Sequence, residues 1–186
     1  MKIGIIGAVR QEVELLFAAL AESGDTVRST RLGSLEFREG TLDGCRVVIV
    51  CCGVGKVNAA ICAQSLIAQL GAEAVINTGS AGGLDPRLSV LDMVVSTDAV
   101  QHDVDATYFG YAPGQVPGSD SPFYAADPIL RKIALSAFAR VAAPGGASGA
   151  PARMPVGTSR LPAMIEGRVA SGDVFVSSDA ARARIA

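Results

Sequence analysis

The sequence lacks the features that are typical of nucleic-acid-binding proteins and of membrane proteins. It has 16 Lys and Arg against 18 Asp and Glu, a net charge of −2, and no basic stripe with interleaved aromatic residues. Proteins that bind phosphate backbones carry such a stripe, so we expect no nucleic-acid partner. No uncharged apolar run approaches the roughly 20 residues that cross a bilayer, and we expect no membrane partner.

A signal peptide and a metal-binding pattern are also missing. The apolar start of the chain is interrupted by Arg10 and Glu12, too early for the apolar region of a signal peptide. The chain has one histidine, His102, and four cysteines without ligand spacing: Cys45, Cys51, Cys52 and Cys62. The adjacent Cys51 and Cys52 have a poor geometry for a disulfide with each other. We therefore expect a cytoplasmic protein with buried, reduced thiols, no metal and no cofactor.

The first half of the chain alternates strand and helix patterns. β-branched and other apolar runs at 2–7, 46–52 and 74–77 are typical of strands buried on both faces. Apolar spacing predicts a helix over 10–22, and a small-residue stretch that ends at Gly71 predicts another over 56–70. A half-exposed strand is expected at 34–41. This alternation predicts an α/β layered domain.

The second half is less regular. Its expected elements are a strand at 91–96, a loop-like region at 101–125, a helix from Asp127 to residue 143 and a strand at 168–176. Residues 144–163 are dominated by Pro, Gly, Ala and Ser, which predicts a surface excursion rather than a packed element. With 49% hydrophobic residues, residues 1–186 are expected to form a single domain.

Two places combine a strand end with groups that could meet a ligand. Glu12 lies where the first strand gives way to the first helix, and ligands of open α/β sheets bind at strand ends. The alternative for Glu12 is a solvated acid that stabilises the helix N-terminus. In 76–83 a buried strand runs into small residues that let backbone amides and a hydroxyl approach a ligand. The alternative there is a plain turn.

Five stretches carry a family resemblance: "MKIGIIGAVRQEVELL", "GVGKVNAA", "INTGSAGGL", "QHDVDATYFGYAPGQVPG" and "SGDVF". In order and rough spacing the chain resembles the 5′-methylthioadenosine/S-adenosylhomocysteine nucleosidases of the nucleoside phosphorylase superfamily, except near 144–163. The resemblance implies a three-layer α/β domain with a central mixed sheet flanked by helices. It also implies hydrolysis of the N-glycosidic bond of 5′-methylthioadenosine and S-adenosylhomocysteine to adenine and the thioribose, in methionine salvage and activated-methyl recycling.

The resemblance implies roles for three residues near the sugar. Glu12 matches the carboxylate that activates the attacking water, and this answers why an acid stands at that strand end. Ser80 matches the serine beside the ribose and the water. Val9 stands where the family usually has methionine next to the ribose, a change in volume expected to perturb fit more than chemistry.

Other matches concern the base, the thio group and a second subunit. Phe175 and Val176 match the pair around adenine, where an aromatic face stacks and a backbone group bonds the base. Phe109 matches the residue that reaches the 5′-thio pocket of the neighbouring subunit. This implies a homodimer with Pro117 near the interface, acting on a small thio-nucleoside. His102 falls in a family block, and we assign it no proton-transfer role.

Two later family motifs are absent from the sequence. They are a Val-Glu-Met-Glu stretch that holds the ribose and a Ser-Asp-x-Ala-Asp stretch whose first Asp protonates the purine. Ser178-Asp179-Ala180-Ala181 lacks the final Asp, and we interpret it as a helix cap. We therefore expect a C-terminally truncated domain, missing its last elements, with doubtful activity alone. A purine nucleoside phosphorylase and a non-catalytic, adenine-nucleoside-binding remnant are the alternatives, and the sequence leaves the preferred thio-nucleoside open.

Overall fold

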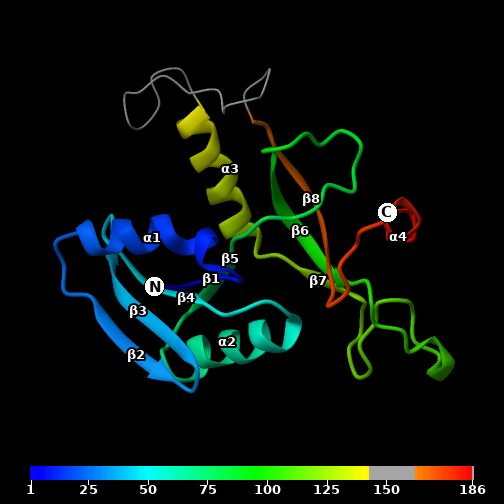
Figure 1. The fold of residues 1–186 in the computed structure, drawn as a ribbon, viewed down its shortest axis with the longest axis horizontal. Helices are drawn as coiled ribbons and strands as arrows, with labels where there is room; N and C mark the ends of the chain where they lie inside the picture. The colour runs from blue at the N-terminus through cyan, green and yellow to red at the C-terminus, as the bar shows by residue number, and fades with distance from the viewer. Residues whose placement is uncertain (143–161, 186) are drawn as a thin grey trace. The chain divides into compact units, whose positions relative to one another are not determined.

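The computed structural model describes residues 1–142 and 162–185 (Figure 1). The chain forms two compact units, Met1–Gly82 and Gly83–Ala186, and each unit has its own sheet. Nearly all of the surface excursion expected at 144–163 lies outside the described residues. The surface excursion therefore stays a prediction. The single domain expected over 1–186 also stays a prediction.

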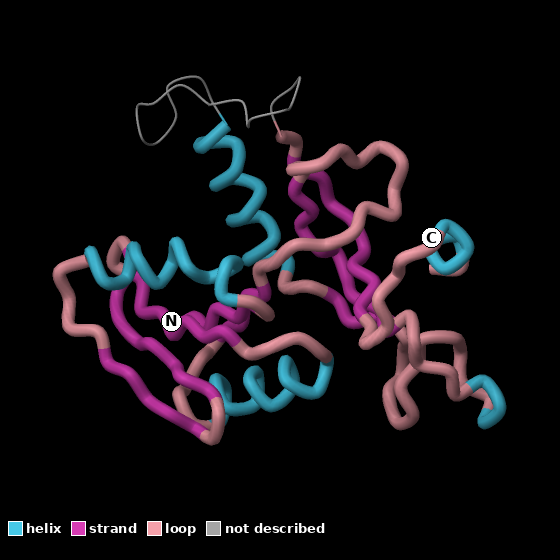
Figure 2. Tube along the Cα trace, viewed as in Figure 1, coloured by secondary structure: helices cyan, strands magenta, loops and turns pink. Residues whose placement is uncertain are grey.

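The first unit is a five-stranded sheet with two helices. The strand order is β2-β3-β4-β1-β5, with β1 parallel to β4 and β5 and with β3 antiparallel to β2 and β4. Figure 2 shows the β2–β4 meander in magenta beside the two helices in cyan. The elements are β1 (Lys2–Gly7), α1 (Arg10–Glu22), β2 (Arg28–Leu32), β3 (Leu35–Leu42), β4 (Cys45–Cys51), α2 (Lys56–Ala68) and β5 (Ala74–Asn77).

The central strand β4 is covered on both faces because its side chains alternate between two cores. One core joins α1 to the sheet and is formed by Val13, Phe17, Leu20, Val47 and Ile49. The other core joins α2 to the sheet through Cys62 and Leu66, together with Val48, Val50, Ile6 and Phe37. Helices α1 and α2 therefore lie on opposite faces of this mixed sheet (Figure 1). The predicted α/β class and the layering of helix, sheet and helix are confirmed.

The second unit holds a three-stranded sheet of order β7-β6-β8, with β6 parallel to β8 and antiparallel to β7. Helix α3 packs against β6. The strands are thus divided between two sheets rather than gathered in one. The elements are β6 (Met93–Gln101), the 3₁₀ turn η1 (Thr107–Phe109), β7 (Phe123–Ala125), α3 (Pro128–Ala142), β8 (Met164–Ser171) and α4 (Asp179–Ala183).

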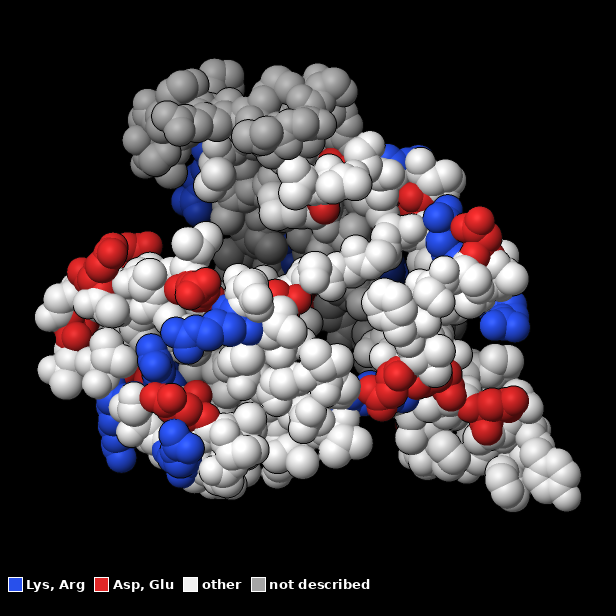
Figure 3. All heavy atoms as spheres, in the orientation of Figure 1, with Lys and Arg blue, Asp and Glu red and all other residues white. Residues whose placement is uncertain are grey.

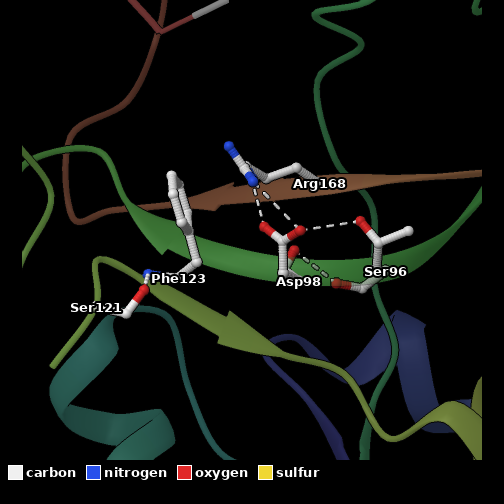
Figure 4. Close-up of polar contacts among 6 residues, drawn as sticks. Ser96, Asp98, Ser121, Phe123 and Arg168 are labelled. Atoms are coloured by element: carbon white, nitrogen blue, oxygen red, sulfur yellow. Dashed lines mark hydrogen bonds and ion pairs between the residues drawn. The ribbon is translucent and has the colours of Figure 1, made fainter. Parts of the chain in front are cut away.

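One polar cluster ties the three strands of the second sheet together (Figure 4). Arg168 of β8 donates from Nε and Nη2 to the carboxylate of Asp98 on β6. Its guanidinium carbon lies 3.7 Å from the ring centroid of Phe123 on β7, an arrangement that favours a cation over an aromatic face. The hydrogen bond from Arg168 holds the pKa of Asp98 below its usual value. These contacts link side chains of all three strands and stabilise the sheet.

Several predicted bounds are wrong, for reasons that lie outside the local sequence. The strand expected at 168–176 is β8, which ends at Ser171, because its pairing with β6 ends at Gln101. Phe175 and Val176 therefore follow the strand. The loop-like region at 101–125 contains the short η1 and β7. Strand β2 was not expected, because it is a polar edge strand paired only with β3.

The cysteines are free, but their expected burial is only partly right. Cys52 and Cys62 are buried, Cys51 is half-buried and Cys45 is exposed. Cys45 begins β4 directly after the turn at Asp43 and Gly44, where the chain has not yet entered the core. Burial raises the pKa of the Cys62 thiol to about 12, which makes this thiol an unreactive core group.

The surface is mixed in charge on the face drawn in Figure 3. Blue Lys and Arg side chains lie beside red Asp and Glu side chains on this face, separated by uncharged residues. Among the ion pairs of the first unit, Arg46 and Lys2 both contact Glu39 of β3. Among the described residues, no helix combines the length and the apolar character that a membrane span requires.

Candidate active site

The junction of β1 and α1 directs the Glu12 side chain back toward the strand end. Val9 is the N-cap residue, with extended φ and ψ of −125° and 156°. One carboxylate oxygen of Glu12, Oε2, accepts hydrogen bonds from the amides of Ala8 at 2.8 Å and Val9 at 3.1 Å. An acidic side chain at this third helical position satisfies amides that the helix leaves unpaired. Val9 has no side-chain acceptor to return the bond, so Glu12 caps the helix alone.

The other oxygen of Glu12 is held from a distant part of the chain. Oε1 accepts hydrogen bonds from the Ser80 amide at 2.9 Å and from Ser80 Oγ at 3.2 Å. Ser80 reaches Glu12 because β5 pairs in parallel with β1 and because the amide of Thr78 donates to the carbonyl of Ile6 at 2.9 Å. Helix capping explains the bonds to Ala8 and Val9, but it does not require the two from Ser80.

Two glycines make room for this carboxylate. A Cβ built on Gly79 would lie 2.7 Å from Glu12 Oε1 and 2.9 Å from its Cδ. A Cβ on Gly7 would lie 2.7 Å from Val13 Cγ1 and 3.1 Å from Glu12 Cβ. Real side chains do not approach so closely, so both positions must be glycine if Glu12 is to keep its place. The small residues after β5 therefore allow a close approach to Glu12, while their predicted approach to a ligand stays a prediction.

The contacts also set the charge of Glu12. Partial burial raises the pKa of its carboxyl, but the amides of Ser80, Val9 and Ala8 and the Ser80 hydroxyl together lower it below the usual value. Hydrogen bonds donated to a carboxylate favour its charged form. Glu12 is therefore ionised near neutral pH and offers a fixed negative charge at the end of β1.

The lowered pKa of Glu12 predicts an acid-sensitive contribution to stability. Since the folded chain binds this proton less strongly than the unfolded chain, ionised Glu12 stabilises the fold above the usual carboxyl pKa of 4.5. The contribution is lost as the pH falls through the lower folded value. We expect thermal denaturation at pH 7 and across the acid range to show a smaller acid-induced loss of stability for Glu12→Gln than for the unchanged chain. Equal losses in both proteins would contradict the assignment.

The structure places the other predicted residues in the second unit. Phe109 is 76% exposed and forms a T-shaped ring pair with Tyr108, with centroids 5.2 Å apart. Pro117 is exposed in the loop that follows. Phe175 is 90% exposed and Val176 is half-buried. Their assigned roles stay predictions.

One motif interpretation is confirmed by geometry. Ser178 is the N-cap of α4, and its Oγ accepts a hydrogen bond from the amide of Ala181 at 3.2 Å. The resemblance of this stretch to the family's purine-protonating motif is therefore explained by a helix start. Among the described residues, no group of three His, Cys, Asp or Glu side chains could hold a metal ion.

Sequence reasoning missed the groups that hold Glu12 through the backbone. The amides of Ala8 and Val9 bind its carboxylate, and Gly79 leaves space for it. Nearly every residue has a backbone amide, so the residue type does not reveal which amides will bind Glu12. The available signal was the absence of a side chain at Gly7 and Gly79, next to a strand end in each case.

Comparison with known proteins agrees with the fold and with the order of the motifs. Residues 2–186 match the family model described as the phosphorylase superfamily. A 5′-methylthioadenosine/S-adenosylhomocysteine nucleosidase of Treponema pallidum is 45% identical over 188 residues, which cover 100% of this chain and 68% of that protein. A protein of the same name from Anoxybacillus flavithermus is 46% identical, covering 76% of this chain and 59% of the relative.

A solved structure gives the same result. The nucleosidase of this name from Neisseria meningitidis, in complex with methylthio-immucillin-A, has a TM-score of 0.83 and 38% sequence identity. The match covers 99% of this chain and 70% of that one. This chain thus spans roughly three fifths to seven tenths of the lengths of these three proteins. The chain belongs to the phosphorylase superfamily and, within it, to the family of 5′-methylthioadenosine/S-adenosylhomocysteine nucleosidases.

Proposed function

We propose that the chain hydrolyses the N-glycosidic bond of 5′-methylthioadenosine and S-adenosylhomocysteine, releasing adenine and the thioribose. The observation that carries the proposal is the Glu12 carboxylate, which is ionised and held by Ser80 at the carboxyl ends of β1 and β5. Strand ends of this kind are where α/β sheets bind ligands. The nucleosidase relatives support the choice of substrate class.

The chemistry needs a group that orients water and takes its proton. As the purine leaves with a proton taken from solvent, the sugar acquires oxocarbenium character, and a carboxylate directs water to the anomeric carbon and receives its proton. A carboxylate has about four lone-pair sites, and four protein donors already occupy Glu12. Water must therefore displace one donor. The Ser80 hydroxyl is the donor to displace, because its bond of 3.2 Å is the longest and the side chain can rotate.

The charge of Glu12 favours water over phosphate as the nucleophile. A phosphorylase of the same superfamily must bind an anion beside the sugar, and a fixed carboxylate would repel that anion. With its lowered pKa, Glu12 keeps this negative charge at neutral pH. The site thus suits hydrolysis better than phosphorolysis.

The remaining roles follow from the family. We assign Phe175 and Val176 to adenine: the exposed ring of Phe175 offers a face on which a base can stack. Phe109 would reach the thio group in the partner subunit of a homodimer, with Pro117 near the interface. An apolar side chain suits an alkylthio tail, which has little to hydrogen-bond. Val9 would lie next to the ribose, and the enzyme would act in the cytoplasm on a small thio-nucleoside without a cofactor.

Product analysis tests the proposed function directly. The purified chain is incubated with each thio-nucleoside, with and without phosphate, and the products are separated by chromatography. We expect free adenine and the unphosphorylated thioribose in both conditions. A sugar 1-phosphate that forms only with phosphate would indicate a phosphorylase. Binding of a substrate analogue in calorimetry without release of adenine would indicate the non-catalytic remnant.

A further inference from the structure

We propose that Asp103 is a positioning residue, which holds the segment that carries Phe175 and Val176 in the direction that adenine requires. The proposal rests on the proposed function, since that function assigns this segment to the base. It concerns only residues of the second unit. Asp103 belongs to the turn after β6, and no role in the proposed chemistry has been given to it.

Asp103 extends the pairing of β6 and β8 beyond the ends of both strands. The last register pair is Gln101 with Ser171. The amide of His102 then donates to the carbonyl of Ser171 at 3.0 Å, and the amide of Asp173 donates to Oδ2 of Asp103 at 2.8 Å. A side chain thus supplies the acceptor that a longer β6 would have supplied from its backbone. Phe175 follows two residues after the amide that is held.

The residue between these bonds is also constrained. A Cβ built on Gly172 would lie 2.7 Å from Cε1 of His102 and closer still to Nε2. The imidazole of His102 therefore packs directly on the Gly172 backbone, and only glycine allows this approach. Three consecutive residues, Ser171 to Asp173, are held by two consecutive residues, His102 and Asp103.

The same turn anchors the loop that contains Phe109. The amide of Val104 donates to the carbonyl of Gln101 at 3.3 Å, and the amide of Gly114 donates to the carbonyl of Val104 at 3.0 Å. The turn at 101–104 is therefore a common base for this loop and for the segment after β8. The contact of Asp103 with that segment is a side-chain hydrogen bond, which a substitution can remove without changing the backbone.

The substitution Asp103→Ala tests the positioning role in the full chain. We expect the amide of Asp173 to exchange with deuterium faster in this variant, because its acceptor is gone. We also expect adenine to bind about tenfold or more weakly in calorimetry, the effect of losing one hydrogen bond to a charged acceptor. Asp103→Asn keeps an oxygen near the Asp173 amide and should restore most of the affinity. Asp120→Ala, which removes an exposed carboxylate from the same unit, should leave both measurements unchanged.

The outcomes separate this inference from the proposed function. Unchanged exchange at Asp173 in Asp103→Ala, or unchanged adenine affinity in a folded variant, would overturn the positioning role. If Asp103→Ala fails to fold, the same two measurements on Asp103→Ser decide, because its shorter side chain withdraws the acceptor from the Asp173 amide. Unaltered adenine affinity in a folded Asp103→Ser protein would overturn the positioning role. If the unchanged chain binds no adenine, the base-binding assignment fails, while exchange at Asp173 still decides whether Asp103 anchors the segment.

Discussion

Replacing Glu12 by glutamine should reduce the release of adenine by a factor of about 100 to 10,000, the usual contribution of a general base. The amide cannot take the proton of the attacking water. It also meets the four donors that now surround the carboxylate with only one accepting atom. Adenine release measured at saturating substrate, where binding differences do not contribute, isolates the chemical effect.

The same substitution should cost stability as well, and the control must separate the two effects. At the half-exposed Glu12 we expect a loss of about 1 kcal/mol in the free energy of unfolding, because the amide leaves donors unpaired. Glu14→Gln is the matched control: Glu14 lies on the same helix, is exposed and only approaches Arg10 at 4.0 Å. It should keep full activity. Unchanged hydrolysis in a folded Glu12→Gln protein would remove the proposed role of this residue.

The substitution Gly79→Ala should reduce activity by about a hundredfold, the cost of misplacing a catalytic group by about an ångström. The new methyl would start 2.7 Å from Glu12 Oε1, so either the carboxylate or the segment after β5 must move. Movement of either one weakens the two hydrogen bonds from Ser80. Kinetic measurements should show the loss mainly in kcat.

Gly82→Ala supplies the comparison for Gly79→Ala. Gly82 lies in the same glycine-rich segment, and a Cβ there would meet nothing within 4 Å. This variant should retain activity, while both variants lose a similar amount of backbone freedom in the unfolded chain. Equal activities of the two variants would show that the space beside Glu12 is not what Gly79 provides.

Strong local patterns predicted the elements of the first unit well. The helix expected at 10–22 is α1 with the same bounds, because its apolar residues recur at the helical period and Gly24 adopts a positive φ of 78° just after it. The β-branched run at 46–52 is β4, shifted by one residue. Such a run is stable only when both faces are covered, and the two cores provide that cover.

Prediction failed where partners set the structure. The sequence of β2 is polar, and the strand exists because β3 supplies its hydrogen bonds. The end of β8 depends on the length of β6, which is not encoded in residues 168–176. Cys45 adjoins an apolar run but lies at the exposed start of β4. In each case long-range pairing or position within the sheet overrides local preference.

The sequence by itself determined that a carboxylate stands at the junction of the first strand and helix, since apolar periodicity defines both elements and Glu12 follows between them. It also determined the family, through five short stretches in a set order. Only the tertiary structure decided which groups meet that carboxylate. Ser80 is 68 positions away and reaches it because β1 and β5 pair in parallel. Likewise, Asp103 meets the amide of Asp173, 70 positions away, because β6 and β8 pair. Local patterns record the period of a strand, whereas the partner and register of that strand are decided by the packing of the whole unit.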